Sequence, residues 1–244
     1  MNTKIKHIIF LLLGIVLISE YSCRKDTYDT SSINTLGYDY YPLVKGKFII
    51  YNIEEISIDV LAGKYDTLRY QLKELLADTI FSKDSIETSY KIERFVRMDS
   101  TKAWEIKNVW QVKQTKTCLI RGEENLPLVK LVYPMVTHQT WNINRYDTLP
   151  EKLNTLKSFD KTDTINGKIF EKVAQTMIVE DTSSIFQKKY EIEKYVRGIG
   201  LAYKQLVDVE SQSKDINKPV DINKPIMQRI TMGTIITWNI YSHN

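Results

Sequence analysis

Cysteine is scarce in this sequence, which has two such residues in 244, Cys23 and Cys118. Two cysteines cannot form a framework of disulfides. The fold must therefore be stabilised by a hydrophobic core. Roughly 200 residues follow the N-terminal segment, and a chain of that length with ordinary hydrophobicity can bury a core of sufficient size.

Histidine is also rare, with three residues, and the sequence holds no His-x-x-x-His or Cys-x-x-Cys pair. Transition-metal sites commonly use such pairs, so we predict no metal site. His138 is expected in a turn, and His243, the penultimate residue, in a disordered terminus. Cys118 and His138 could form a catalytic dyad, but a lone cysteine between Thr117 and Leu119 is more typical of a strand residue buried as a small hydrophobe.

Motifs for nucleophilic catalysis and nucleotide binding are missing as well. There is no Gly-x-Ser-x-Gly elbow. Gly198-Ile199-Gly200 lacks the third glycine and the following helix of a dinucleotide fingerprint, so we interpret it as a bulge or bend. Carboxylate pairs occur at 54–55, 123–124 and 180–181, and we expect them at solvated turns or edges because neighbours on a strand face opposite ways. We predict no catalytic residue and no cofactor; a hydrolase without linear motifs is the lesser alternative.

Neither sign of charge dominates. The formal net charge is +4, and it becomes +3 when residues 1–22, with two lysines and one glutamate, are removed. Because the two signs are interspersed, we predict no nucleic-acid binding. The one long hydrophobic run is Ile8–Ile18, which would rise only about 16 Å as a helix against about 30 Å for a bilayer core. With Lys4 and Lys6 ahead of it, this run is typical of a signal peptide.

Cys23 lies where a bacterial lipoprotein signal holds its lipidated cysteine, with Ser22 as the small residue before the cleavage point. We therefore predict a lipoprotein signal peptide at residues 1–22, lipid attachment at Cys23, and a flexible tether over residues 23–39. The protein would be an outer-membrane lipoprotein on the periplasmic side or at the cell surface. An ordinary secreted protein is the alternative. Lys25-Asp26 is either a charged export signal or part of a solvated tether.

Beyond residue 40, glycine and alanine are sparse, whereas tyrosine, isoleucine, valine and threonine are abundant. Apolar and polar residues alternate with a period of two in three stretches, which predicts strands near 47–60, 128–133 and 233–240. Asn166-Gly167 favours a type I′ hairpin. Leu153 and Leu156, behind Pro150, could form one short helix. We predict a single all-β, antiparallel domain over residues 40–244, with at most one short helix besides the signal peptide.

One octapeptide occurs twice: residues 90–97 read YKIERFVR and residues 190–197 read YEIEKYVR. In each, alternation places Tyr, Ile and Val on one face of a strand and the acidic residue and last Arg on the other. A second match pairs YPLV at 41–44 with YPMV at 133–136. These matches predict two similar curved halves, about 40–130 and 131–244, that form a sandwich or a partly open barrel. Coincidence in a sequence rich in tyrosine and valine is the alternative.

The segments YYPLVKGKFIIYNI, YVRGIGLAYKQLVDVE and ITWNIY resemble a family of lipoproteins from the Bacteroidota. Those proteins open with Tyr-Pro-Leu, a glycine and an aromatic strand, and close with Gly-Ile-Gly-Leu, an aromatic residue and lysine. The resemblance spans most of residues 40–241, with Phe48-Ile49 where many relatives carry an aromatic pair. It implies an envelope location and a β-rich fold, and it implies no activity.

Together these features predict a lipid-anchored envelope protein with a non-catalytic partner-binding or assembly role. The alternative is a ligand-binding lipoprotein that holds a glycan on an aromatic face or an acyl chain inside a half-barrel. Trp104, Trp110, Trp141 and Trp238 are candidates for such a face, although we expect tryptophans first of all in the core of a sheet protein without disulfides. The predicted partners are the membrane, through lipid at Cys23, and an envelope protein.

Overall fold

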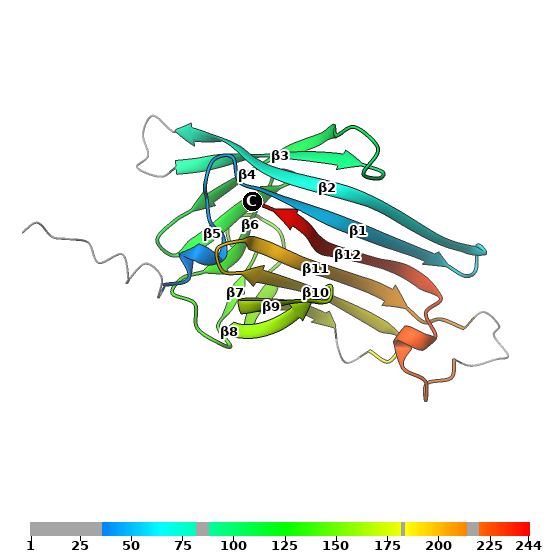
Figure 1. Ribbon diagram of the computed structural model, residues 1–244. Coiled ribbons are helices and arrows are strands. Elements are labelled where there is room, and N and C mark those ends of the chain that lie inside the picture. The colour runs from blue at the N-terminus through cyan, green and yellow to red at the C-terminus, as the bar shows by residue number, and fades with distance from the viewer. Residues whose placement is uncertain (1–35, 82–87, 182–183, 214–219) are drawn as a thin grey trace, which may run out of the picture. The chain divides into compact units, whose positions relative to one another are not determined.

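The computed structural model describes residues 36–81, 88–181, 184–213 and 220–244, all within the unit Asn34–Asn244 (Figure 1). Its strands are β1 (Phe48–Asp59), β2 (Lys64–Phe81), β3 (Thr88–Arg97), β4 (Glu105–Gln114), β5 (Cys118–Glu123), β6 (Leu126–Val132), β7 (Thr140–Asn142), β8 (Leu153–Ile165), β9 (Lys168–Asp181), β10 (Gln187–Val196), β11 (Gly200–Glu210) and β12 (Met232–His243). Two 3-10 turns accompany the strands, η1 (Tyr38–Tyr40) and η2 (Ile226–Gln228). None of the described helical pieces is long and apolar enough to span a membrane.

All twelve strands belong to one sheet, in the order β6-β5-β4-β3-β2-β1-β12-β11-β10-β9-β8-β7. Every neighbouring pair is antiparallel. Strands β1 to β6 form one meander that runs outwards from the centre, and β7 to β12 form a second that runs back to it. The first and last strands therefore pair with each other. The predicted all-β, antiparallel fold with two curved halves is confirmed.

The two outer strands of the sheet, β6 and β7, approach each other and curl the sheet. The backbone N–H of Val129 in β6 donates to the carbonyl of Ile143, just after β7, over 2.9 Å. The indole N–H of Trp141 in β7 donates to the carbonyl of Val129, also over 2.9 Å. Because one continuous sheet meets itself at Val129, it forms a partly open barrel.

Two local predictions meet different outcomes. Asn166 and Gly167 both have positive φ angles, 49° and 76°, and they join β8 to β9 as the predicted hairpin turn. The short helix at Leu153 and Leu156 is wrong, because both residues belong to β8. Leu156 is buried while Leu153 is exposed, because residues three positions apart on a strand point to opposite faces of the sheet.

The repeated octapeptide forms β3 and β10, each the third strand from the β1–β12 centre. Alternation holds in both copies, but the copies bury opposite faces. Ile92 and Arg94 are buried in β3, whereas Glu191, Glu193 and Tyr195 are buried in β10. The same pattern therefore turns a base inwards in one half and two acids inwards in the other.

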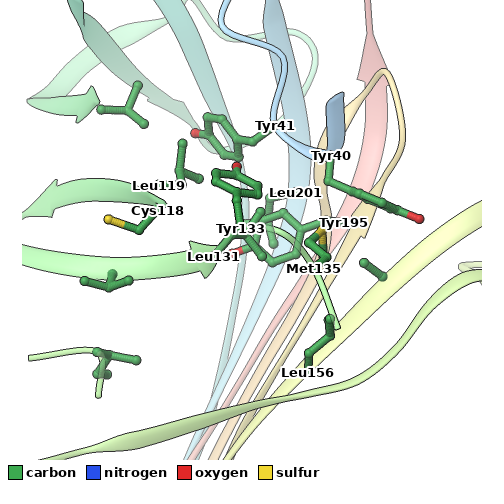
Figure 2. Packing of buried hydrophobic residues seen from close by; sticks show 14 of the residues in the cluster. Tyr40, Tyr41, Cys118, Leu119, Leu131, Tyr133, Met135, Leu156, Tyr195 and Leu201 are labelled. Carbon is green, nitrogen blue, oxygen red and sulfur yellow. The ribbon is translucent and has the colours of Figure 1, made fainter. Parts of the chain in front are cut away.

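The main core lies inside the curled sheet and is rich in tyrosine (Figure 2). Tyr41 and Tyr133, which begin the two Tyr-Pro matches, are both buried there, and the Tyr41 ring lies 6.4 Å from that of Tyr195. Cys118 also belongs to this cluster, at 3% exposure. The prediction of a cysteine buried as a small hydrophobe is confirmed.

Candidate functional site

The residues singled out from the sequence do not converge on a catalytic group. Cys23 lies outside the described residues. The Cys118 sulfur contacts hydroxyls of Thr115 and Tyr146, at 3.4 and 3.9 Å, and within the described chain no hydrogen bond joins it to His138. His138 is exposed in a turn, at φ 68°. His243, expected in a disordered terminus, instead ends β12, where it pairs with Ile49.

The two members of each described carboxylate pair lie in different surroundings. Glu54 accepts from Arg69 Nε at 2.6 Å on one face, while Glu55 accepts from the Tyr70 hydroxyl at 2.6 Å on the other. Glu124 is exposed, as expected, but Glu123 points into the barrel. The expectation of a solvated turn or edge is wrong for Glu123, because β5 turns alternate side chains towards the interior. It is also wrong for the 54–55 pair, which lies within β1, an inner strand of the sheet. The side chains of residues 180 and 181 lie outside the described set.

A cluster of charged side chains occupies the barrel interior, and sequence reasoning missed it. We call it the interior charge cluster. Its members are Glu74, Arg94, Arg121, Glu123, Lys130, Glu191, Glu193 and Lys204. Four carboxylates face four cations, so the formal charge cancels. A usable signal was present in Arg121-x-Glu123 and Glu191-x-Glu193, since positions two apart on a strand share a face.

In the first half of the cluster, Glu74 joins two arginines. Its Oε1 accepts from Arg94 Nε at 2.9 Å and from Arg121 at 2.5 Å. Trp110 covers both guanidinium groups, with its ring centre 3.4 Å from the Arg94 Cζ and 4.8 Å from the Arg121 Cζ. The arginines are thus fixed by a carboxylate on one side and an aromatic face on another.

In the second half, two lysines hold two glutamates. Lys130 Nζ lies 2.6 Å from Glu193, and Lys204 Nζ lies 2.7 Å from Glu191 and 3.4 Å from Glu193. Glu193 also accepts from the Tyr195 hydroxyl at 2.5 Å. Because Lys130 belongs to β6 and Glu193 to β10, these contacts tie the two meanders together across the interior.

The four tryptophans divide between core and surface. Trp141 is buried, and Trp110 and Trp238 are half-buried and pack against the core next to the interior charge cluster. The Lys204 Nζ lies 5.8 Å from the Trp238 ring centre. Trp104 is half-buried after the β3–β4 turn, with the Arg97 guanidinium 4.2 Å from its ring centre. Expecting tryptophan in the core was therefore correct for three of the four.

Ionisation of the interior charge cluster is set by burial and by its opposite charges. Burial alone would raise the pKa of the Glu193 and Glu123 carboxyls, but Lys130 and other cations nearby hold both below their ordinary value. Burial alone would lower the pKa of Lys130 and Lys204, but the glutamates raise both. All four groups are therefore charged at neutral pH and already paired, which favours a structural role over proton transfer.

These shifts predict a stability that falls at both pH extremes. A carboxyl with a lowered folded pKa stabilises the fold above its ordinary pKa, 4.5 for Glu193, and this contribution is lost as the pH falls through the folded pKa. A lysine with a raised folded pKa stabilises the fold below its ordinary pKa, 10.5 for Lys130. This contribution is lost as the pH rises through the folded pKa. The urea concentration at the midpoint of unfolding should therefore be highest between about pH 5 and about pH 10. A midpoint that rises on acidification from pH 5 to 3 would contradict the assignment.

A small cavity adjoins the interior charge cluster at Glu74. This cavity of about 30 Å³ is lined by Tyr41, Ile49, Tyr51, Glu74 and Gly200 among others. Such a volume holds about one or two water molecules. An acyl chain needs far more room than this cavity offers.

Exposed apolar side chains gather at the end of the sheet formed by the β1–β2, β9–β10 and β11–β12 connections. We call this set the distal rim; its members are Leu61, Tyr65, Ile185, Phe186, Ile222, Met227 and Met232, which are 37% to 68% exposed. The connections are hydrogen-bonded to one another. The Val60 N–H donates to the Thr231 carbonyl and the Ser211 N–H to the Phe186 carbonyl, each at 2.8 Å.

No protein-family model matches this sequence, and no curated protein matches it. Among solved structures, a "putative lipoprotein" from Parabacteroides distasonis aligns with 84% of this chain and 98% of its own, at 10% identity and a TM-score of 0.41. A "putative exported protein with YmcC-like fold" from Bacteroides fragilis aligns with 83% of this chain and 98% of its own, at 10% identity and a TM-score of 0.36. At these values neither likeness assigns an activity to this chain.

Proposed function

We propose that this chain is a lipid-anchored protein of the outer membrane that binds a protein partner through the distal rim and catalyses no reaction. The observation that carries the proposal is that seven exposed apolar side chains lie in or beside three hydrogen-bonded connections at one end of the sheet. Scattered surface apolar residues are normal, but grouped ones are typical of interaction surfaces. Inside the barrel, by contrast, the charged side chains are engaged with one another.

The position of the rim suits an anchored protein. Figure 1 shows η1, where the described chain begins, at one end of the long strands and the β1–β2 turn at the other. The Asp39 carbonyl in η1 accepts from the Gly198 N–H, which fixes the N-terminal entry at the β10–β11 turn. A lipid on Cys23 would therefore attach to the domain at the end opposite the rim, leaving the rim for another protein.

An unpaired strand edge adjoins the rim. β2 pairs with β1 from Lys64 onwards, but β3 joins β2 only at Gln71. In the described part of the chain, residues 64–70 thus have a strand on one side only, and 64–69 are all exposed. Such an edge can accept an extended segment from another protein. We propose that the partner supplies this segment and covers the rim with its apolar side chains.

Photocrosslinking in the native host tests the proposal. A benzoyl-phenylalanine in place of Tyr65 should give one dominant adduct of defined mass after irradiation of whole cells. Leu61→Glu and Ile222→Glu should each reduce its yield at least fivefold, because a charge facing an apolar contact opposes binding.

The matched control is benzoyl-phenylalanine in place of Ile169, which is 74% exposed beside the β8–β9 turn and outside the rim. It should give no such adduct. Equal labelling from both positions, or an adduct that persists in both glutamate variants, would refute binding at the distal rim.

A further inference from the structure

A concave pocket of about 560 Å³ opens on the sheet face opposite the buried side chains of Tyr51 and Leu72. Three carboxamides line it in one cross-strand row, because Gln71 pairs with Asn52 and Asn52 with Asn239. The pocket shares no residue with the distal rim. Its volume is within the usual range for small-molecule sites.

The carboxamide row is held in a fixed orientation. Arg97 Nε donates to the Gln71 side-chain oxygen at 2.8 Å, and Gln71 Nε2 donates to the Asn52 side-chain oxygen at 2.9 Å. Arg97 itself is fixed by the Ser100 carbonyl at 3.3 Å and by stacking on Trp104. The relay engages the oxygen of the exposed Asn52 side chain and not its amide N–H₂, which can donate to a ligand. The Asn239 carboxamide in the same row offers both a donor and an acceptor.

An aromatic ring and an apolar side chain complete the pocket. Tyr241 is the extra residue of the β1–β12 bulge, since Tyr51 pairs with Ile240 and Ile50 with Ser242. A bulge re-aims the side chain at its extra position. Tyr241 is 49% exposed and lines the pocket, as does Met98 in the β3–β4 turn.

The charges of the pocket compensate one another. Glu54 lies 2.6 Å from Arg69. Asp99 interacts electrostatically with Arg97, the arginine that holds Gln71. A ligand with a net charge gains little from such a site. A ligand with many hydroxyl groups gains more, because each hydroxyl can both donate to and accept from a carboxamide, and a pyranose ring offers an apolar face to Tyr241.

We propose that this pocket is a binding site for a short neutral saccharide. Asn52 and Asn239 hydrogen-bond its hydroxyl groups, Tyr241 stacks on one ring, and Gln71 and Arg97 position Asn52. The site is independent of the distal rim, so saccharide binding and partner binding can fail separately.

Calorimetry on the full-length chain in zwitterionic detergent micelles tests this site. The probes are maltose, lactose, cellobiose and N,N′-diacetylchitobiose, with a glucuronic-acid disaccharide as the charged comparison. At least one neutral disaccharide should bind, with a Kd below about 1 mM and at least tenfold more tightly than the charged one. Asn52→Ala and Tyr241→Ala should each weaken binding at least tenfold. Gln71→Leu should weaken it less, because it removes only the support of Asn52.

Tyr65→Ala is the matched control, since Tyr65 is 68% exposed outside the pocket, and it should leave the saccharide Kd unchanged. Asn52 and Tyr241 are exposed, so their variants should keep the wild-type near-UV circular dichroism. Failure of all four neutral disaccharides to bind, tighter binding of the charged one, or unchanged binding in both alanine variants would overturn the proposal.

Discussion

Lys130→Met should lower the free energy of unfolding by about 3–5 kcal/mol, the usual cost of removing one partner from a buried ion pair. The Lys130 side chain is 6% exposed, and its Nζ approaches three glutamates, at 2.6 Å from Glu193 and 3.8 Å from Glu123 and Glu191. Its loss leaves the interior charge cluster with one uncompensated negative charge, and water cannot reach the cluster freely to replace the ammonium group. Urea unfolding at pH 7, followed by tryptophan fluorescence, measures the change.

Two further variants separate this effect from simple loss of a side chain. Lys130→Met with Glu193→Gln should recover part of the lost stability, because the two changes remove one charge of each sign. Arg69→Ala breaks the exposed pair with Glu54, whose side chains are 72% and 38% exposed, and should cost about 0.2–1 kcal/mol. If Lys130→Met costs no more than Arg69→Ala, the cluster does not hold the two meanders together.

The strands of this fold could be predicted from local pattern. The alternating stretches 47–60, 128–133 and 233–240 correspond to β1, β6 and β12, each within two or three residues. The helix predicted at Leu153 and Leu156 is wrong because two leucines three positions apart fit either structure. In a helix their side chains would share a face, and in a strand they lie on opposite faces. Pairing of β8 with β7 and β9 decides between the two, and the strand partners of Leu153 and Leu156 lie more than ten positions away, at Asn142 and Thr176.

The interior charge cluster could not be predicted in the same way. A buried charge and a solvated one look identical in a strand, and the sequence shows which side chains share a face but not which face is inside. The two octapeptides illustrate this, since nearly identical residues bury Arg94 in one copy and Glu193 in the other. Only strand order brings the acids of β10 to the cation of β6.

The outer-face pocket depends on register in a similar way. Asn52, Gln71 and Asn239 are separated by up to 187 positions in the chain, and they share one row only because β2, β1 and β12 are neighbours with that register. A shift of one residue in either pairing would turn one amide to the opposite face. Composition cannot show which of the many aromatic side chains is exposed at a binding face, whereas the structure places Tyr241 in this pocket at the β1–β12 bulge.

Cys23→Ala should transfer the protein in the native host from the membrane to the soluble fraction almost completely. Each acyl methylene that enters a bilayer contributes about 0.8 kcal/mol, so two or three chains hold a protein on a membrane essentially permanently. Without the cysteine there is no sulfur to carry the lipid, and no described helical piece can replace it as a spanning anchor. Immunoblots of carbonate-washed membranes, together with Triton X-114 partition, measure the distribution.

Cys118→Ala is the matched control, since it removes the only other cysteine in the sequence. Cys118 is 3% exposed in the core, so its alanine variant should remain in the membrane and in the detergent phase. The detergent phase separates true anchoring from sedimentation of aggregates, because unlipidated aggregates do not partition into it. A Cys23→Ala protein that still partitions with detergent would mean that something other than a lipid on this cysteine holds the chain, and the orientation argued for the distal rim would lose its basis.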